Sequence, residues 1–121
     1  MLEIVEDTPG NILAIRASGE VTSEDYEAVM VPAVERKLGE FDKVRMLYEL
    51  GPEMKGFTAG AMWQDAKVGM SHLLSFDKIA VVTDHTWLAN AVRAFALMMP
   101  CPVKIFSTAE RDAAKDWISD N

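Results

Sequence analysis

The chain has 121 residues, half of them hydrophobic, and its formal net charge is −7, from 19 acidic and 12 basic residues. This length fits one domain with a substantial core, and the hydrophobic content argues against disorder. The negative charge has no Lys/Arg cluster to offset it, which argues against nucleic-acid partners and against attraction to anionic lipid. One cysteine excludes an internal disulfide. With no leader-like start and no apolar run of about 18 residues, we expect a soluble cytoplasmic protein.

The first half of the chain predicts a hairpin, a helix and a buried strand. Residues 2–6 and 12–17 are strand candidates around a Pro-Gly turn at 7–11, which predicts an antiparallel pair. Thr22 and the acids after it are typical of a helix start, and Pro32 is expected to bend that helix. Residues 44–50 are apolar at both parities, which predicts a strand covered on both faces, followed by a loop over 51–56.

The second half predicts alternating helices and strands. A helix over 58–74 carries one broad apolar arc, formed by Ala59, Met62, Trp63, Ala66, Met70, Leu73 and Leu74. A strand over 78–83 precedes a helix over 86–99 that Asp84 or Thr86 caps and Pro100 and Pro102 end. After a strand over 103–106, the capping-box spacing of Ser107 and Glu110 opens a last helix. The order β-β-α-β-α-β-α-β-α predicts an α/β fold with a mostly parallel five-stranded sheet and an antiparallel first strand.

The helix over 86–99 has almost no polar face. On a helical wheel, the residues that must face the sheet are Leu88, Val92, Phe95 and Met99. The remaining apolar residues are Trp87, Ala94, Leu97 and Met98. This surplus surface is covered by a neighbouring helix or a dimer partner, or else it faces a ligand or a membrane.

The sequence shows no catalytic or metal-binding signature. His72 and His85 lack metal-ligand spacing with each other or with Cys101. Glu49 and Glu53 flank one loop, but no partner makes them an acid/base pair. There is neither a Gly-rich phosphate loop nor a nucleophile elbow. We therefore expect no catalytic residue, no metal, no cofactor and no enzymatic activity.

A family resemblance rests on four stretches, which are Phe57–Asp65, Phe76–Trp87, Val103–Phe106 and Ala113–Ile118. They resemble the SpoIIAA-like bacterial family, which belongs to the fold group of sulfate-transporter and anti-sigma-factor-antagonist (STAS) domains. The resemblance implies a single SpoIIAA-like domain over residues 1–121. Anti-sigma-factor antagonists carry a phosphorylated serine where the helix after the third strand begins. The matching stretch, Leu50–Thr58, contains no serine, so the resemblance implies Thr58 as the candidate phosphorylation site.

The resemblance also implies a second function, because lipid-carrier domains of related fold part their helices to admit a nonpolar ligand. The leading hypothesis is a non-enzymatic module that binds or senses a nonpolar, lipid-like ligand between helices 58–74 and 86–99, with transient membrane association. Its predicted lining residues are Met62, Trp63, Met70, Trp87, Phe95 and Met98. The alternative is a protein–protein regulatory module of anti-sigma-factor-antagonist type, or a homodimerisation domain, that uses the same surface.

Overall fold

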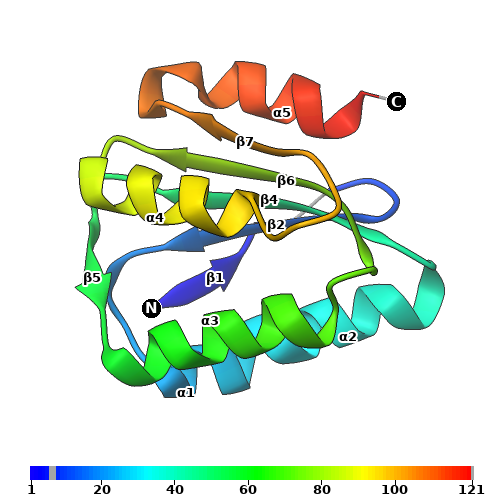
Figure 1. The fold of residues 1–121 in the computed structure, drawn as a ribbon, viewed down its shortest axis with the longest axis horizontal. Helices are drawn as coiled ribbons and strands as arrows, with labels where there is room; N and C mark the ends of the chain where they lie inside the picture. The colour runs from blue at the N-terminus through cyan, green and yellow to red at the C-terminus, as the bar shows by residue number, and fades with distance from the viewer. Residues whose placement is uncertain (6–7, 121) are drawn as a thin grey trace.

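A five-stranded sheet forms the centre of the protein, in the strand order β1-β2-β4-β6-β7 (Figure 1). The computed structural model describes residues 1–5 and 8–120, so positions 6 and 7 of the predicted strand and turn lie outside the described residues. The strands are β1 (Leu2–Ile4), β2 (Ile12–Ala17), β4 (Val44–Leu50), β6 (Phe76–Thr83) and β7 (Val103–Phe106). β1 is antiparallel to β2, and the other pairs are parallel. The predicted α/β fold with an antiparallel first strand is confirmed.

Helices cover both faces of this sheet (Figure 1). The helices α2 (Val31–Glu40), α3 (Ala59–Ser71) and α4 (Thr86–Ala96) lie on one face, and α5 (Arg111–Ser119) lies on the other. Successive residues of a strand point to opposite faces. Met46, Tyr48 and Leu50 of β4 therefore join the core cluster under α2, α3 and α4, whereas Leu47 joins the cluster under α5.

The first helical segment begins at Thr22, as the sequence predicts. The Thr22 hydroxyl accepts from the backbone N–H of Asp25 at 3.3 Å, and the Asp25 carboxylate accepts from the Thr22 N–H at 2.8 Å. The short helix α1 (Ser23–Asp25) continues through five residues of π-helix, η1 (Tyr26–Met30), into α2. Pro32 lies in the first turn of α2, where proline is tolerated. The structure shows a change of helix type just before Pro32, and the bend at Pro32 stays a prediction.

A second, two-stranded sheet was not predicted. β3 (Gly19–Val21) pairs in parallel with β5 (Met54–Phe57), so the prediction of a loop over 51–56 is wrong from Met54 onward. Both strands contain glycine, and Gly19 has a φ of 60°, a conformation that glycine adopts without strain. This small sheet fixes Phe57 and the start of α3.

Three helix ends differ from the predictions. α3 ends at Ser71 rather than residue 74, and α4 ends at Ala96, ahead of the two prolines. The N-cap of α4 is His85, which makes no side-chain cap bond. Asp84 instead accepts from the backbone N–H of Thr108 at 2.9 Å, so the predicted cap by Asp84 or Thr86 is wrong. The capping box of Ser107 and Glu110 is confirmed; it opens the short 3-10 helix η2 (Thr108–Glu110), which leads into α5.

Candidate functional site

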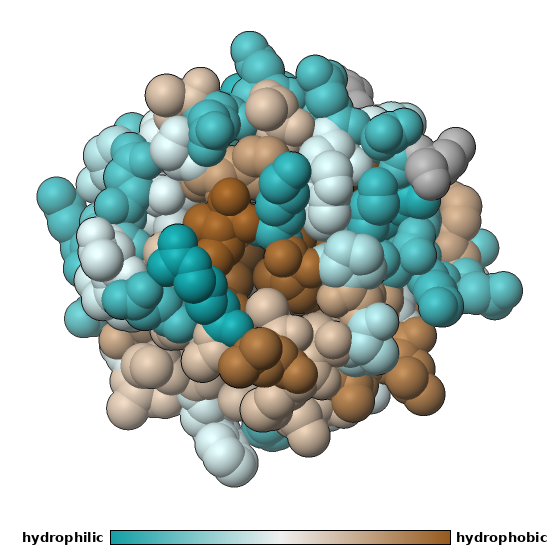
Figure 2. Space-filling view, turned by 45° about the horizontal axis from the view of Figure 1, so that its top comes forward, coloured by the Kyte–Doolittle hydropathy of each residue, from teal (hydrophilic) through white to brown (hydrophobic). Residues whose placement is uncertain are grey.

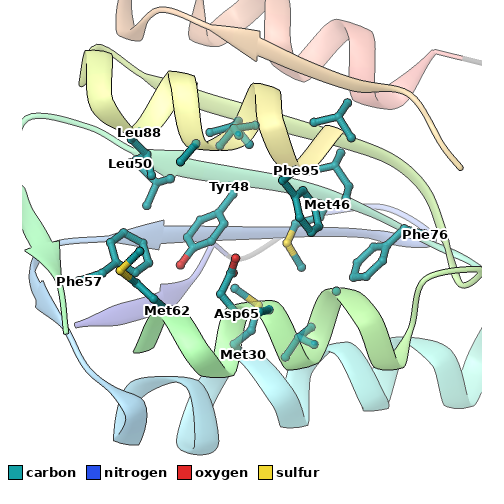
Figure 3. A pocket seen from close by; sticks show the side chains of 18 of the residues that line it. Met30, Met46, Tyr48, Leu50, Phe57, Met62, Asp65, Phe76, Leu88 and Phe95 are labelled. Carbon is teal, nitrogen blue, oxygen red and sulfur yellow. The ribbon is translucent and has the colours of Figure 1, made fainter. Parts of the chain in front are cut away.

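A cavity of about 200 Å³ lies between the sheet and the helices α3 and α4 (Figure 3). Its lining comes from β4, β6, α3, α4 and neighbouring segments, and most of it is apolar. Representative lining residues are Met46, Leu50, Val68, Val81, Leu88 and Phe95. Protein interiors pack densely and contain few voids larger than a water molecule. Two other pockets, of about 220 and 250 Å³, are lined by charged as well as apolar residues. The cavity beside α3 and α4, which is open to solvent at Met62 and Trp87, is distinguished by its nearly all-apolar lining.

Two aromatic side chains of α4 contact neighbouring elements beside the cavity, Trp87 at Phe57 of β5 and Phe95 at Gly69 of α3. Near the start of α4, the Trp87 ring meets Phe57 edge-on, with ring centroids 6.5 Å apart and planes at 82°. Near the end of α4, Phe95 packs against Gly69 of α3 so closely that a Cβ there would lie 2.9 Å from two ring carbons. The side chain of residue 69 must therefore be absent for α3 and α4 to approach at this point.

The structure brings together half of the predicted lining residues. Met62, Trp87 and Phe95 line the cavity. Trp63, Met70 and Met98 do not; they are 68%, 58% and 61% exposed.

The orientation of α3 explains this difference. The helix turns small residues inward, and its buried residues are Ala61, Val68 and Gly69. Leu74, beyond its end, is 75% exposed. The predicted apolar arc of helix 58–74 is therefore not the buried face of α3, because close packing against the sheet and α4 selects small side chains there. Of the arc, only Met62 and Ala66 line the cavity, and Leu73 packs against the core.

The wheel analysis of α4 is confirmed. Leu88 and Met99 are buried, and Val92 and Phe95 pack against the same core cluster. The surplus residues, Trp87, Ala94, Leu97 and Met98, are all exposed. Apolar residues also gather near the middle of the face seen in Figure 2, among hydrophilic side chains.

A polar chain enters this apolar cavity. The Tyr26 hydroxyl donates to Oδ1 of Asp65 at 2.7 Å, and it lies 2.9 Å from the Tyr48 hydroxyl. A tyrosine hydroxyl has one hydrogen. Because Tyr26 gives its hydrogen to Asp65, Tyr48 must donate to the Tyr26 oxygen. Asp65 and Tyr48 both line the cavity, and Figure 3 shows their oxygens at its centre.

The surroundings of this chain oppose negative charge. Burial raises the pKa of Asp65, and the hydrogen bond from Tyr26 only partly offsets that effect. Burial and the nearby Asp65 charge also raise the pKa values of Tyr26 and Tyr48, so both hydroxyls stay protonated at neutral pH. Among the described residues that line the cavity, none is a lysine, arginine or histidine.

Sequence reasoning missed Asp65, Tyr26 and Tyr48 as site residues. A signal was present, because Ala61, Asp65 and Gly69 recur at intervals of four residues and so share one face of α3. Two small residues on that face mark a close approach of the helix. The carboxylate between them must therefore meet the interior of the protein.

Comparison with known proteins identifies the family. A family model described as SpoIIAA-like matches residues 12–119. The chain belongs to the SpoIIAA-like family. This domain is similar to an uncharacterized DUF3478-family protein with a SpoIIAA-like fold from Shewanella loihica PV-4, at 27% identity and a TM-score of 0.79, over 97% of this chain and 93% of that one. It is also similar to the anti-sigma factor antagonist SpoIIAA in its unphosphorylated form, at 13% identity and a TM-score of 0.63, over the full length of both chains.

The second likeness shows the shared STAS-type fold, as the sequence resemblance predicts. No curated protein matches this SpoIIAA-like chain significantly. Within residues 1–5 and 8–120, no helix is both long and apolar enough to cross a membrane.

Thr58 is the N-cap of α3 in this SpoIIAA-like domain. Its Oγ1 accepts from the backbone N–H of Ala61 at 3.0 Å, and the residue is partly exposed. A phosphate at a helix N-terminus is electrostatically favourable. Phosphorylation would replace the existing hydroxyl cap, so Thr58 stays a predicted modification site.

The remaining chemical candidates lie apart from the cavity. His85 Nε2 is 3.3 Å from the carbonyl oxygen of Gly51, and burial raises the pKa of the Cys101 thiol. Over the part of the chain that the structure describes, no three His, Cys, Asp or Glu side chains are grouped to hold a metal ion.

Proposed function

We propose that this SpoIIAA-like domain is a non-enzymatic binding module whose ligand occupies the cavity between α3 and α4. The observation that supports this proposal is an apolar cavity of about 200 Å³ between α3, α4 and the sheet, open to solvent on one side. A dry apolar cavity of about 150 Å³ binds benzene. The cavity therefore has room for one ring or a short chain that is mostly apolar.

A longer, lipid-like chain requires the helices to part. Such a movement would separate Trp87 from Phe57 and Phe95 from Gly69. Both are non-covalent packing contacts, so they can break and form again. Membrane association during such opening would use the exposed side chains of Leu97 and Met98.

Titration of the purified protein with toluene, followed by backbone amide chemical shifts, tests binding to the cavity without movement of the helices. We expect saturable binding with shifts concentrated in α3, α4 and β6. Val92→Phe adds a ring to a side chain that lines the cavity and should weaken binding at least about tenfold. Ala94→Phe adds the same ring to an exposed position of the same helix and should leave binding unchanged. Linear, non-saturating shifts, or equal effects of the two variants, would contradict the proposal.

Titration with a fluorescent fatty acid tests the open form. Saturable binding that competes with toluene supports opening at the same cavity. Met98 lies outside the cavity, so Met98→Glu should leave the binding of free fatty acid intact. It should weaken binding only where the fatty acid is delivered from a membrane. Comparison of free fatty acid with fatty acid presented in neutral phosphatidylcholine vesicles separates the two routes.

A second candidate function is a regulatory protein-interaction module or homodimer. The observation that favours it is the outer surface of α3, where Trp63 and Met70 are largely exposed without lining the cavity. Exposed apolar patches of several hundred Å² on a monomer commonly mark interaction sites. Light scattering over a range of concentrations tests self-association. Loss of association in Leu97→Glu or Trp63→Glu would support it, whereas a concentration-independent monomer would exclude the homodimer.

A further inference from the structure

The polar chain in the cavity has a fixed direction. Tyr48 donates to Tyr26, and Tyr26 donates to Oδ1 of Asp65. Both tyrosine hydrogens are therefore used within the protein and point toward the carboxylate. What remains available to the cavity is the second oxygen of Asp65 and a lone pair on the Tyr48 oxygen. Both of these groups accept hydrogen bonds.

We propose that the ligand carries a hydrogen-bond donor, a hydroxyl or an amine, that reaches Asp65 and Tyr48, and that the cavity discriminates against carboxylates of the same shape. This inference rests on the proposed binding function of the cavity and specifies the chemical class of its ligand. The apolar walls bind the body of such a ligand, and the two acceptors orient its polar end.

The charge distribution supports a donor. No described lining residue supplies a positive charge to Asp65, so the carboxylate is held by one tyrosine hydrogen alone within the cavity wall. A ligand hydroxyl or ammonium group would supply the missing donor, and hydrogen bonds to a charged group are among the stronger ones. A carboxylate ligand would place a second negative charge beside Asp65, which disfavours the ionised form of both groups.

Four probes that share one ring separate these effects. Toluene measures the apolar contribution, benzyl alcohol and benzylamine add a donor, and benzoate adds a carboxylate. We expect the alcohol and the amine to bind at least about tenfold more tightly than benzoate, as one charge-assisted hydrogen bond predicts. The affinity for benzylamine should exceed that for benzyl alcohol if charge contributes in addition to hydrogen bonding.

Two variants test the assignment to Asp65. In Asp65→Asn, the amide oxygen keeps the bond from Tyr26, so its NH₂ group faces the cavity as a donor. This variant should lose the preference for benzylamine over benzoate, and toluene affinity measured in parallel corrects for any general change in the cavity. Tyr48→Phe leaves the Tyr26–Asp65 bond in place and should reduce the preference by a smaller factor. Trp63→Ala, outside the cavity, is the control and should leave all four affinities unchanged. Circular dichroism verifies that each variant is folded.

The outcomes distinguish the two proposals. Saturable toluene binding with equal affinities for the three polar probes would overturn the donor preference and leave the binding function standing. Tighter binding of benzoate than of benzylamine would show that Asp65 is the donor and would also overturn it. If none of the four probes binds, both the binding function and the preference fail.

Discussion

Two carboxylates lie on opposite sides of the sheet and differ in burial and in partners; Glu49 is buried, and Asp65 is partly exposed. Glu49 of β4 is 5% exposed and faces α5, where Arg16 contacts one of its oxygens at 3.3 Å and Arg111 contacts the other. Asp65 of α3 faces the opposite side, and its partner among the described residues is the hydroxyl of Tyr26. The first carboxylate has two cations, and the second has a neutral donor in an apolar cavity.

This difference favours a structural role for Glu49 and agrees with the proposed binding role of Asp65. A buried charge is stable when its hydrogen-bonding capacity is met and its charge is paired, as for Glu49. A partly satisfied polar group in an apolar environment raises the free energy of the empty protein and lowers the cost of binding a complementary group. The Glu49 cluster joins β2, β4 and α5, whereas Asp65 leaves one side of its carboxylate to the cavity.

Matched amide substitutions provide the largest expected contrast. Glu49→Gln removes the charge between two arginines and should lower the free energy of unfolding by about 2–3 kcal/mol at pH 7. This loss is smaller than the loss on breaking a fully buried ion pair, because water can solvate both arginines once the charge on Glu49 is removed. The side chains of Arg16 and Arg111 are 47% and 35% exposed. Asp65→Asn should change the free energy by less than about 1 kcal/mol, because it keeps the bond from Tyr26. Urea denaturation measures both values, and equal losses would contradict the comparison.

A pair of glycine substitutions tests the packing around the cavity. In Gly69→Ala the new Cβ meets Phe95, and the overpacking should cost about 1–2 kcal/mol after the gain in helix propensity. Gly39→Ala lies in α2 with no atom within 4 Å of the new Cβ, and it should stabilise by about 0.5–1 kcal/mol. Thermal unfolding measures both. If Gly69→Ala stabilises like Gly39→Ala, Phe95 moves freely and the two helices are not held by this contact.

The contribution of Asp65 to stability should depend on pH. The pKa of Asp65 is raised in the folded protein, so between its unfolded value near pH 4 and its folded value the native state holds more protons. The contribution of Asp65 to stability is therefore full below about pH 4 and is lost as the pH rises through that window. The free energy of unfolding of wild type minus that of Asp65→Asn should fall over this pH range and become constant above it. A difference that rises with pH would show that a cation pairs with Asp65.

The sequence predicts most of the fold because its strongest signals are local. The capping residues Thr22, Ser107 and Glu110 act within one turn, and the apolar run at 44–50 indicates a buried strand regardless of its neighbours. The paired strands β3 and β5 are short, contain glycine and join segments far apart in the chain. Their pairing depends on the tertiary structure, which no local pattern encodes.

The candidate site was predictable in location but not in chemistry. The apolar residues of α4 indicate a surface that needs a partner, and three of the six predicted lining residues do line the cavity. Hydrophobicity alone predicts the wrong buried face for α3, because it gives no weight to the small residues that allow close approach of the helix. The role of Asp65 depends on Tyr26, which is 39 positions away in the sequence. Only the folded chain brings that donor to the carboxylate.

The smallest expected effect on stability concerns exposed apolar residues on α3 and just beyond its end. Trp63→Ser and Leu74→Ser should each change the free energy of unfolding by no more than about 0.5 kcal/mol, because both side chains are largely exposed. Neither residue lines the cavity, so affinity for toluene should also stay constant. A loss above about 1 kcal/mol, dependent on protein concentration, would show that these side chains are buried between copies of the chain. Stability therefore reports on the Glu49 cluster, and ligand affinity reports on the cavity beside Asp65. Association reports on the exposed side chains of Trp63 and Leu74.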